Sequence, residues 1–279
     1  MIVVTAAGGQ TGAAVVRKLR ERGEQVRAVV ARRGPRPDLA ALGAEVVLGE
    51  LTQPLPWAKL LDGADAFHLI WPHADPDEAE GAGALFAEAR RAGVGRIVYH
   101  SVLHPQARVM PHHAAKDRAE ESLESAGVPW RVLRPCTYAQ TLDASLDEVA
   151  RTGVLRSYWG VRTAQSLVDV EDVAAAAAVL LTEDGLDGGT FEAAGPEPLT
   201  APRIAELMGE RLGREVVADD VIPAGEQPTA YAARCRRAMF DHHREHGFVG
   251  SPRVLAALLG RSPRSYAEHL AELPLPVSG

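Results

Sequence analysis

Short apolar runs alternate with longer amphipathic segments along the first half of the chain. We predict strands at 2–4, 25–31, 45–49, 64–71, 95–101 and 129–133, where these runs lie. Most of the segments between them are rich in Ala, Leu, Glu and Arg and are long enough for helices. Strands that alternate with helices form right-handed crossovers and a parallel sheet. The pattern predicts a doubly wound α/β fold.

The alternation stops near Pro135, and a second part of the chain follows. Residues 136–167 are predicted to be irregular, 168–174 to end a strand and start a helix, and 190–194 to form another strand. Helices are predicted at 201–212, 227–246, 252–259 and 265–273. We therefore expect a doubly wound domain of residues 1–135 plus 168–194. A smaller, mostly helical substrate lobe takes residues 136–167 plus 195–279.

A glycine-containing turn separates the first predicted strand from the first predicted helix. Small residues let the backbone approach a pyrophosphate, and the helix N-terminus offers free N–H groups to it. The turn predicts a phosphate site in a Rossmann domain, with an ordinary strand-to-helix turn as the alternative. The residues expected to bind the cofactor here are Thr5, Ala7, Gly9, Gln10, Thr11 and Gly12.

Composition narrows the class of protein further. Hydrophobic residues make up 46% of the 279 residues, so a sizeable core is available. The net charge is −7 and Lys and Arg are scattered, which argues against nucleic acid as a direct ligand. No apolar run is long enough to span a bilayer, and no signal peptide is expected. Cys136 and Cys235 are expected to be free thiols in a reducing cytoplasm.

Several motifs together carry a resemblance to a known family. They lie at residues 5–12, 101–105, 110–116, 133–135, 169–174, 194–197 and 259–263. With these motifs the chain resembles, over essentially its whole length, the NmrA-like members of the atypical short-chain dehydrogenase/reductase superfamily. The resemblance implies a Rossmann domain that binds NAD(P) and a small C-terminal lobe. The family contains both reductases and cofactor-sensing regulators, so the resemblance leaves activity open.

The chain departs from the family pattern at two positions. Ala6 stands where a glycine usually follows Thr5, and alanine disfavours a positive φ. His112 stands where the superfamily's catalytic Tyr-x-x-x-Lys has its tyrosine, whereas Lys116 is retained. The resemblance implies that Lys116 faces the nicotinamide ribose, and in isoflavone-reductase-like relatives the matching lysine is the general acid/base. The alternative is a surface lysine paired with Glu120.

Other polar residues near this motif are candidates for chemistry or substrate contact. His112 titrates near neutrality and could donate the missing proton, or it could line the cleft without chemistry. Ser101 could polarise a carbonyl group, or it could cap a turn at the end of its strand. Residues expected to contact substrate are His104, Met110, His113, Tyr138, Tyr158 and Trp159. We expect no metal, because His242 and His246 have no evident third ligand.

Cofactor choice depends on the residues after the second predicted strand. NAD specificity normally requires a carboxylate there, but the chain has Arg32 and Arg33, which suit the 2′-phosphate of NADP(H). A solvated basic loop is the alternative. The resemblance places Glu50 and Leu51 near the adenine.

Three functions remain open from the sequence. The first is an NADPH-dependent oxidoreductase acting on a small carbonyl, quinone or enone. The second is a non-catalytic regulator that senses NADP(H), which the lost tyrosine favours. The third is a cofactor-binding enzyme of net non-redox chemistry, such as cyclisation or isomerisation. The expected partner is a small molecule, with no nucleic acid and no membrane, and a homodimer stays open.

Overall fold

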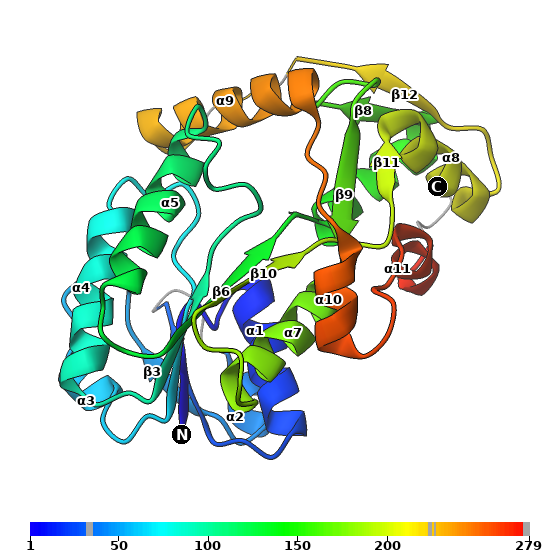
Figure 1. Ribbon diagram of the computed structural model, residues 1–279. Coiled ribbons are helices and arrows are strands. Elements are labelled where there is room, and N and C mark those ends of the chain that lie inside the picture. Colours follow the sequence, from blue (N-terminus) through cyan, green and yellow to red (C-terminus); the bar gives the residue numbers. More distant parts are fainter. Residues whose placement is uncertain (32–35, 223–224, 226, 276–279) are drawn as a thin grey trace. The chain divides into compact units, whose positions relative to one another are not determined.

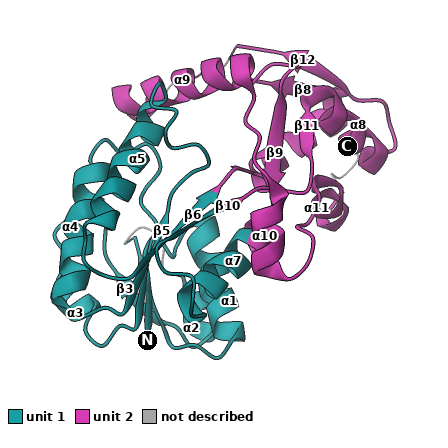
Figure 2. Cartoon of the chain, viewed as in Figure 1, with its two compact units in different colours: residues 1–134, 173–191 teal, residues 135–172, 192–279 magenta. Residues whose placement is uncertain are grey.

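The chain folds into two units, and each unit takes residues from two stretches of the sequence (Figure 2). In this computed structural model, unit 1 contains Met1–Arg134 and Val173–Phe191, and unit 2 contains Pro135–Asp172 and Glu192–Gly279. Residues 1–31, 36–222, 225 and 227–275 are described. The sequence pattern predicts the corresponding divisions after residues 135, 167 and 194.

Unit 1 is built on a sheet that, in the described part of the chain, has seven strands in the order β10-β6-β5-β4-β1-β2-β3 (Figure 1). Its strands are β1 (Ile2–Val4), β2 (Val26–Val30), β3 (Glu45–Leu48), β4 (Ala66–Leu69), β5 (Arg96–His100), β6 (Trp130–Pro135) and β10 (Gly189–Ala193). The neighbouring pairs from β6 to β3 are all parallel. The order reverses between β1 and β4, and ligands of doubly wound sheets bind at the carboxyl ends of the strands beside such a reversal.

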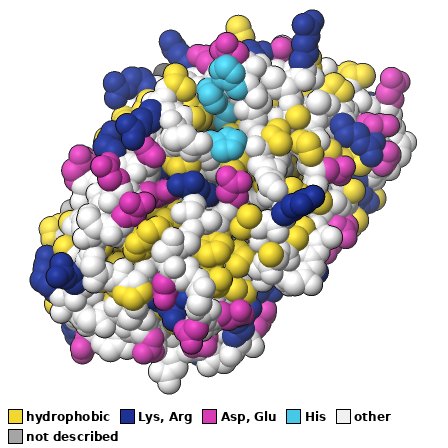
Figure 3. Space-filling view, viewed as in Figure 1, with side chains coloured by type: hydrophobic (Ala, Val, Ile, Leu, Met, Phe, Trp, Pro, Cys, Tyr) yellow, Lys and Arg dark blue, Asp and Glu magenta, His cyan; other side chains and the backbone are white. Residues whose placement is uncertain are grey.

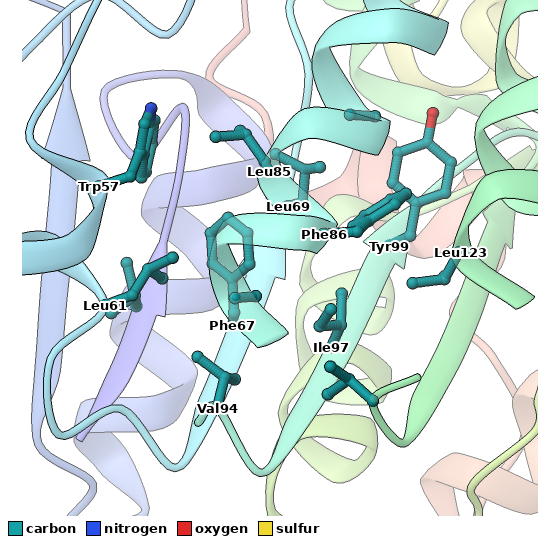
Figure 4. Packing of buried hydrophobic residues seen from close by; sticks show 14 of the residues in the cluster. Trp57, Leu61, Phe67, Leu69, Leu85, Phe86, Val94, Ile97, Tyr99 and Leu123 are labelled. Carbon is teal, nitrogen blue, oxygen red and sulfur yellow. The ribbon is translucent and has the colours of Figure 1, made fainter. Parts of the chain in front are cut away.

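Helices cover both faces of this sheet (Figure 1). They are α1 (Gln10–Glu21), α2 (Pro37–Ala41), α3 (Trp57–Leu60), α4 (Glu78–Arg91), α5 (Pro111–Glu124) and α7 (Val170–Thr182). On the face beneath α3, α4 and α5, Phe67, Ile97 and Tyr99 pack against Phe86 and Leu123 (Figure 4). Burial of such side chains is the main source of folding free energy.

Three arginines converge on the C-terminal end of α7. Arg131, which is completely buried on β6, donates to the carbonyl of Leu180 and to Asp187. Arg96 on β5 donates to the carbonyls of Leu181 and Glu183, and Arg22 at the end of α1 donates to Thr182. The last carbonyls of a helix have no partner within the helix, and cations interact favourably with them. These contacts attach α7 to the sheet.

Unit 2 contains more strands than its sequence pattern predicts. Its elements are β7 (Thr137–Tyr138), a 3₁₀ helix (Ala139–Ser145), α6 (Leu146–Thr152), β8 (Val154–Ser157), β9 (Ala164–Val168), β11 (Pro198–Thr200), α8 (Ala201–Leu212), β12 (Val217–Asp220), α9 (Ala230–His246), α10 (Pro252–Leu259) and α11 (Tyr266–Glu272). The strands pair as β11-β9-β7 and β12-β8. The stretch 136–167, expected to be irregular, thus holds five short elements, and elements this short show little periodicity.

An ionic network within unit 2 joins Asp169 and Asp172 to the C-terminal part of that unit. Asp169 accepts a hydrogen bond from the Glu171 amide at the start of α7 (2.8 Å), and Asp172 accepts from Arg261 (2.5 Å). Arg264 contacts both carboxylates: its guanidinium lies 3.2 Å from Asp169, and its backbone N–H donates to Asp172 at 2.6 Å. The motifs at 169–174 and 259–263 therefore meet in unit 2.

His269 of α11 extends this network. Its Nε2 lies 2.7 Å from Asp143 and its Nδ1 lies 3.5 Å from Asp169. Burial opposes the charged imidazole, but the bonds to Asp169 and Asp143 outweigh it, and the pKa of His269 is raised. Burial also opposes the charged form of Asp169, but its bonds to His269 and its neighbours lower its pKa to about 2. The network therefore contains charged groups that compensate one another.

His68 is a buried polar group in the middle of the unit 1 sheet. It lies on β4, is fully buried, and its ring centroid is 5.5 Å from that of His100 on β5. Within the described residues, neither of its ring nitrogens has a hydrogen-bond partner. Burial lowers the pKa of His68 from 6.5 to about 3, and it also lowers the pKa of His100. Both imidazoles are therefore neutral in the folded protein at pH 7.

We expect the protein to lose stability as the pH falls from 6.5 towards 3, in part through His68. The unfolded state binds a proton near pH 6.5, whereas the folded state resists it until about pH 3, so protonation favours unfolding. The slope from one such group is about 1.4 kcal/mol per pH unit. Urea unfolding between pH 7 and 5 should show a shallower loss for His68→Leu. His246→Gln, at an exposed histidine, is the control, and equal slopes for wild type and His68→Leu would contradict the assignment.

Candidate active site

Thr5 ties together the carboxyl ends of β1 and β4. Its backbone N–H donates to the carbonyl of His68 (3.1 Å). Its hydroxyl donates to the carbonyl of Ile70 (2.9 Å) and accepts from the amide of the same residue (2.8 Å). Ala7 makes the corresponding link to β2, because its amide donates to the Val29 carbonyl at 3.0 Å. Thr5 and Ala7 are both fully buried, so their side chains position the turn.

The glycine turn leaves the N-terminus of α1 open. Gly9 is the N-cap residue, no side chain caps the helix, and its first turn has no acidic residue. Gly9 and Gln10 are exposed and Thr11 is half-buried. Uncapped N–H groups at the positive end of a helix dipole bind anions, and a cofactor pyrophosphate is such an anion. The backbone here fits the phosphate site expected from the sequence.

Gly12 and Ala6 are in close contact across this turn. A Cβ atom at Gly12 would lie 2.4 Å from the Ala6 carbonyl oxygen and 2.7 Å from the Ala7 Cα. Ala6 itself has a φ of 47°, in the left-handed region that glycine occupies without strain. The departure from the family glycine therefore keeps the left-handed conformation in this chain, at a cost of about 1–2 kcal/mol.

Lys116 lies on α5 and reaches the end of β5. Its Nζ donates to Glu78 Oε1 (2.6 Å) and to the carbonyl of His100 (3.1 Å). The hydroxyl of Tyr99 donates to the same Glu78 oxygen at 2.8 Å. Burial and the Glu78 carboxylate hold the pKa of Tyr99 well above its usual range, so the phenol stays protonated. The alternative pairing of Lys116 with Glu120 is wrong.

Glu120 instead belongs to a separate cluster with Ser101. The Ser101 hydroxyl donates to Glu120 Oε1, and Arg134 donates to both oxygens of that carboxylate. Ser101 is 3% exposed. Its hydroxyl proton is therefore engaged by Glu120 in this structure, and its catalytic role stays a prediction.

Histidines gather at the start of α5. The rings of His112 and His113 lie 4.6 Å apart, and His73 lies 5.5 Å from His112. His113 Nδ1 lies 2.9 Å from the carbonyl of His104, a residue with a φ of 53°. His112, His113 and Met110 are all buried. His112 is on the same helix as Lys116, one turn before it, as the motif predicts.

Of the residues expected to contact the adenosine part of the cofactor, the structure describes Glu50 and Leu51. Arg32 and Arg33 lie outside the described residues. Leu51 packs against the apolar core, and Glu50 is half-buried beside it. Arg36, which sequence reasoning missed, donates to the carbonyl of Gly8 (2.6 Å) and to Asp38 (2.9 Å). A guanidinium from the segment after β2 thus touches the glycine turn.

The aromatic candidates for substrate contact lie in unit 2. Tyr158 packs against Phe240 of α9, with ring centroids 5.6 Å apart. Trp159 packs against the core of this unit, and Tyr138 is half-buried on β7. Their role as a pocket wall stays a prediction.

Sequence reasoning missed the acidic partners of this site. Glu78 is separated from Lys116 by 38 positions. Its place at the start of a helix after the fourth strand was the only available signal. Tyr99 lies in a strand that the pattern predicts and Arg134 directly follows another, but nothing in the spacing indicated which carboxylate each would meet.

The charged surface shows no single basic region on the face in Figure 3, because Lys and Arg alternate with Asp and Glu there. Among the described residues, we find no helix with both the length and the apolar character needed to cross a membrane.

The fold and the turn define a nucleotide-binding protein, and comparison with known sequences gives its family. Residues 6–184 match the model of the NAD(P)H-binding family, and the chain belongs to that family. It is 32% identical over 217 residues to (4-alkanoyl-5-oxo-2,5-dihydrofuran-3-yl)methyl phosphate reductase of Streptomyces griseus. That match covers 77% of this chain and 74% of the relative.

Solved structures confirm the predicted fold. The NADPH-dependent quinone oxidoreductase QOR2 of Escherichia coli, in complex with NADPH, superposes with a TM-score of 0.85 at 23% identity. The superposition covers 97% of this chain and 99% of the QOR2 chain. NmrA, a negative transcriptional regulator, superposes with a TM-score of 0.83 at 19% identity. This superposition covers 98% of this chain and 95% of the NmrA chain. Both similarities confirm the fold that the NmrA-like resemblance implies.

We expect Gly12→Ala to destabilise the protein even without cofactor. The new methyl group would overlap the Ala6 carbonyl, and relief of such overpacking costs about 1–3 kcal/mol. Gly9→Ala is the matched control in the same turn, since its Cβ would lie 3.4 Å from the nearest atom. Urea unfolding of both apo variants measures the difference. A Gly12→Ala protein as stable as Gly9→Ala would show that the turn relaxes freely.

Proposed function

We propose that this protein is an NADPH-dependent oxidoreductase that reduces a small substrate with an electron-poor carbon, such as a quinone, an enone or another carbonyl compound. The observation that carries the proposal is the Lys116 ammonium, which is fixed at the end of β5 in a chain of the NAD(P)H-binding family. The reductase and quinone oxidoreductase among the similar proteins support the reaction class.

The site residues divide the work of such a reduction. The open N-terminus of α1 binds the pyrophosphate, and Lys116 binds the ribose hydroxyls. A bound NADPH would supply a hydride to the acceptor carbon and would be oxidised to NADP⁺. His112, or a water molecule, would donate the proton that neutralises the negative charge developing on the substrate. His112 or water would thus take the place of the superfamily's tyrosine as the proton donor.

We expect NADPH to bind at least about tenfold more tightly than NADH, a difference of about 1.4 kcal/mol. The motivation is the basic segment after β2, which contains Arg32, Arg33 and Arg36 and lacks the carboxylate that binds an NAD ribose. Calorimetric titration of both cofactors measures the ratio, and Arg32→Ala should reduce it. Equal affinities in the wild-type protein, or an unchanged preference in Arg32→Ala, would refute this assignment.

We expect Lys116→Ala and His112→Phe to affect different steps. Lys116→Ala should weaken NADPH binding and slow turnover, because it removes a cofactor contact. His112→Phe should slow turnover by about 10²–10⁴-fold, the usual contribution of a general acid, and spare NADPH affinity. The assay follows NADPH oxidation with quinones, enones, ketones and 5-oxo-2,5-dihydrofurans.

Two outcomes would contradict this scheme. If both variants turn over a confirmed substrate at the wild-type rate, the proposed roles of Lys116 and His112 are wrong. If the protein binds NADPH and the cofactor alters its binding to a partner protein while no substrate is reduced, the sensor function applies. The lost tyrosine at His112 and the similarity to NmrA favour that second candidate.

A further inference from the structure

The partner of Lys116 is a carboxylate that lies outside the motifs behind the family resemblance. Glu78 is the first residue of α4 and is 1% exposed. Its Oε1 atom accepts from both Lys116 Nζ and the Tyr99 hydroxyl. An ion pair this deeply buried contributes little net stability, because desolvation offsets the attraction, so stability alone is a poor reason for its presence.

The first turn of α4 makes close contacts with two aromatic residues. Tyr99 rises from the apolar cluster with its hydroxyl pointing away from Phe86 and Ile97 (Figure 4), and it donates to Glu78. The Trp71 indole also lies against Gly81 in this turn, where a Cβ atom would be 2.1 Å from the ring. The Glu78 carboxylate is thus bonded to Tyr99 on a helix turn that packs closely against Trp71.

The geometry of Lys116 leaves one N–H for a ligand. An ammonium group has three N–H donors, and within the described residues two of them are used, by Glu78 and by the His100 carbonyl. The side chain keeps 12% of its surface exposed, and its ammonium also lies 5.3 Å from the centroid of the Tyr99 ring. Two fixed acceptors determine where the third donor points.

We infer that Glu78 is a positioning residue of the cofactor site, whose buried carboxylate orients the Lys116 ammonium so that its third N–H meets the cofactor ribose. This inference rests on the proposed role of Lys116 in cofactor binding. A carboxylate is needed because the lysine side chain is flexible and strongly hydrated, and a charge-assisted bond in a buried setting holds it in one geometry.

The test is a double-mutant cycle on NADPH affinity with Glu78→Gln and Lys116→Met. Glu78→Gln should weaken NADPH binding about fivefold or more in the wild-type background and have no further effect once Lys116 is Met. Glu80→Gln, which removes an exposed carboxylate from the same helix, is the matched control and should leave the affinity unchanged. Calorimetric titration supplies the dissociation constants.

Thermal unfolding of the same apo variants gives a second readout that needs no cofactor. Lys116→Met leaves a buried carboxylate without its cation, so its melting temperature should fall. The double variant should melt higher than Lys116→Met, because Glu78→Gln removes the uncompensated charge. This recovery shows that both residues are coupled in the folded protein and that the variants still fold.

The outcomes separate the inference from the proposed function. If Lys116→Met weakens NADPH binding but Glu78→Gln costs the same affinity in both backgrounds, Glu78 has only a structural role and the inference is wrong. If Glu78→Gln changes nothing in the wild-type background, the inference is also wrong while the function stands. If Lys116→Met binds NADPH like the wild type, the proposed role of Lys116 fails, and the inference fails with it.

Discussion

The candidate site of unit 1 depends on the Thr5 hydroxyl, which holds the carboxyl ends of β1 and β4 together. It bonds to both backbone groups of Ile70 and so fixes the end of β1 against the segment leaving β4. The carboxyl ends of the strands lead into loops, and loops are more mobile than the strands that they connect. With these ends fixed, Gly12 can pack against the Ala6 carbonyl and start α1 directly over the turn. The strained Ala6 is tolerated because its neighbours determine its backbone conformation.

Two separate ion pairs form along α5, one between Lys116 and Glu78 and the other between Glu120 and Arg134. Lys116 and Glu120 lie one turn apart on α5, and this spacing suggests a surface pair. In the folded chain each meets a buried partner instead: Lys116 meets Glu78 from α4, and Glu120 meets Arg134 from β6. Buried charges require compensation far more than exposed ones do. The burial of α5 against the sheet therefore decides the pairing, and the sequence spacing does not.

The sequence predicted the long, strongly patterned features and missed those that depend on tertiary contact. The six strands of the first half and the helices at 201–212 and 252–259 followed from periodicity and caps. The elements within 136–167 did not, since β7 has two residues and β8 four. Lys116 and the glycine turn were visible as local motifs. Glu78 and Arg36 were not, because each acts through a residue distant in sequence, and a single sequence contains no information on that pairing.

The motifs behind the family resemblance have two physical meanings. Those at residues 5–12 and 110–116 lie in unit 1 and contain the turn and the lysine of the candidate site. Those at 169–174 and 259–263 meet in unit 2 as Asp172 with Arg261, and Asp169 with Arg264. Asp169 and Asp172 are almost completely buried, so loss of either arginine would leave a charge that water cannot solvate. Their similarity to the family therefore indicates how unit 2 is assembled, whereas the first set contains the turn and the lysine on which the proposed function rests.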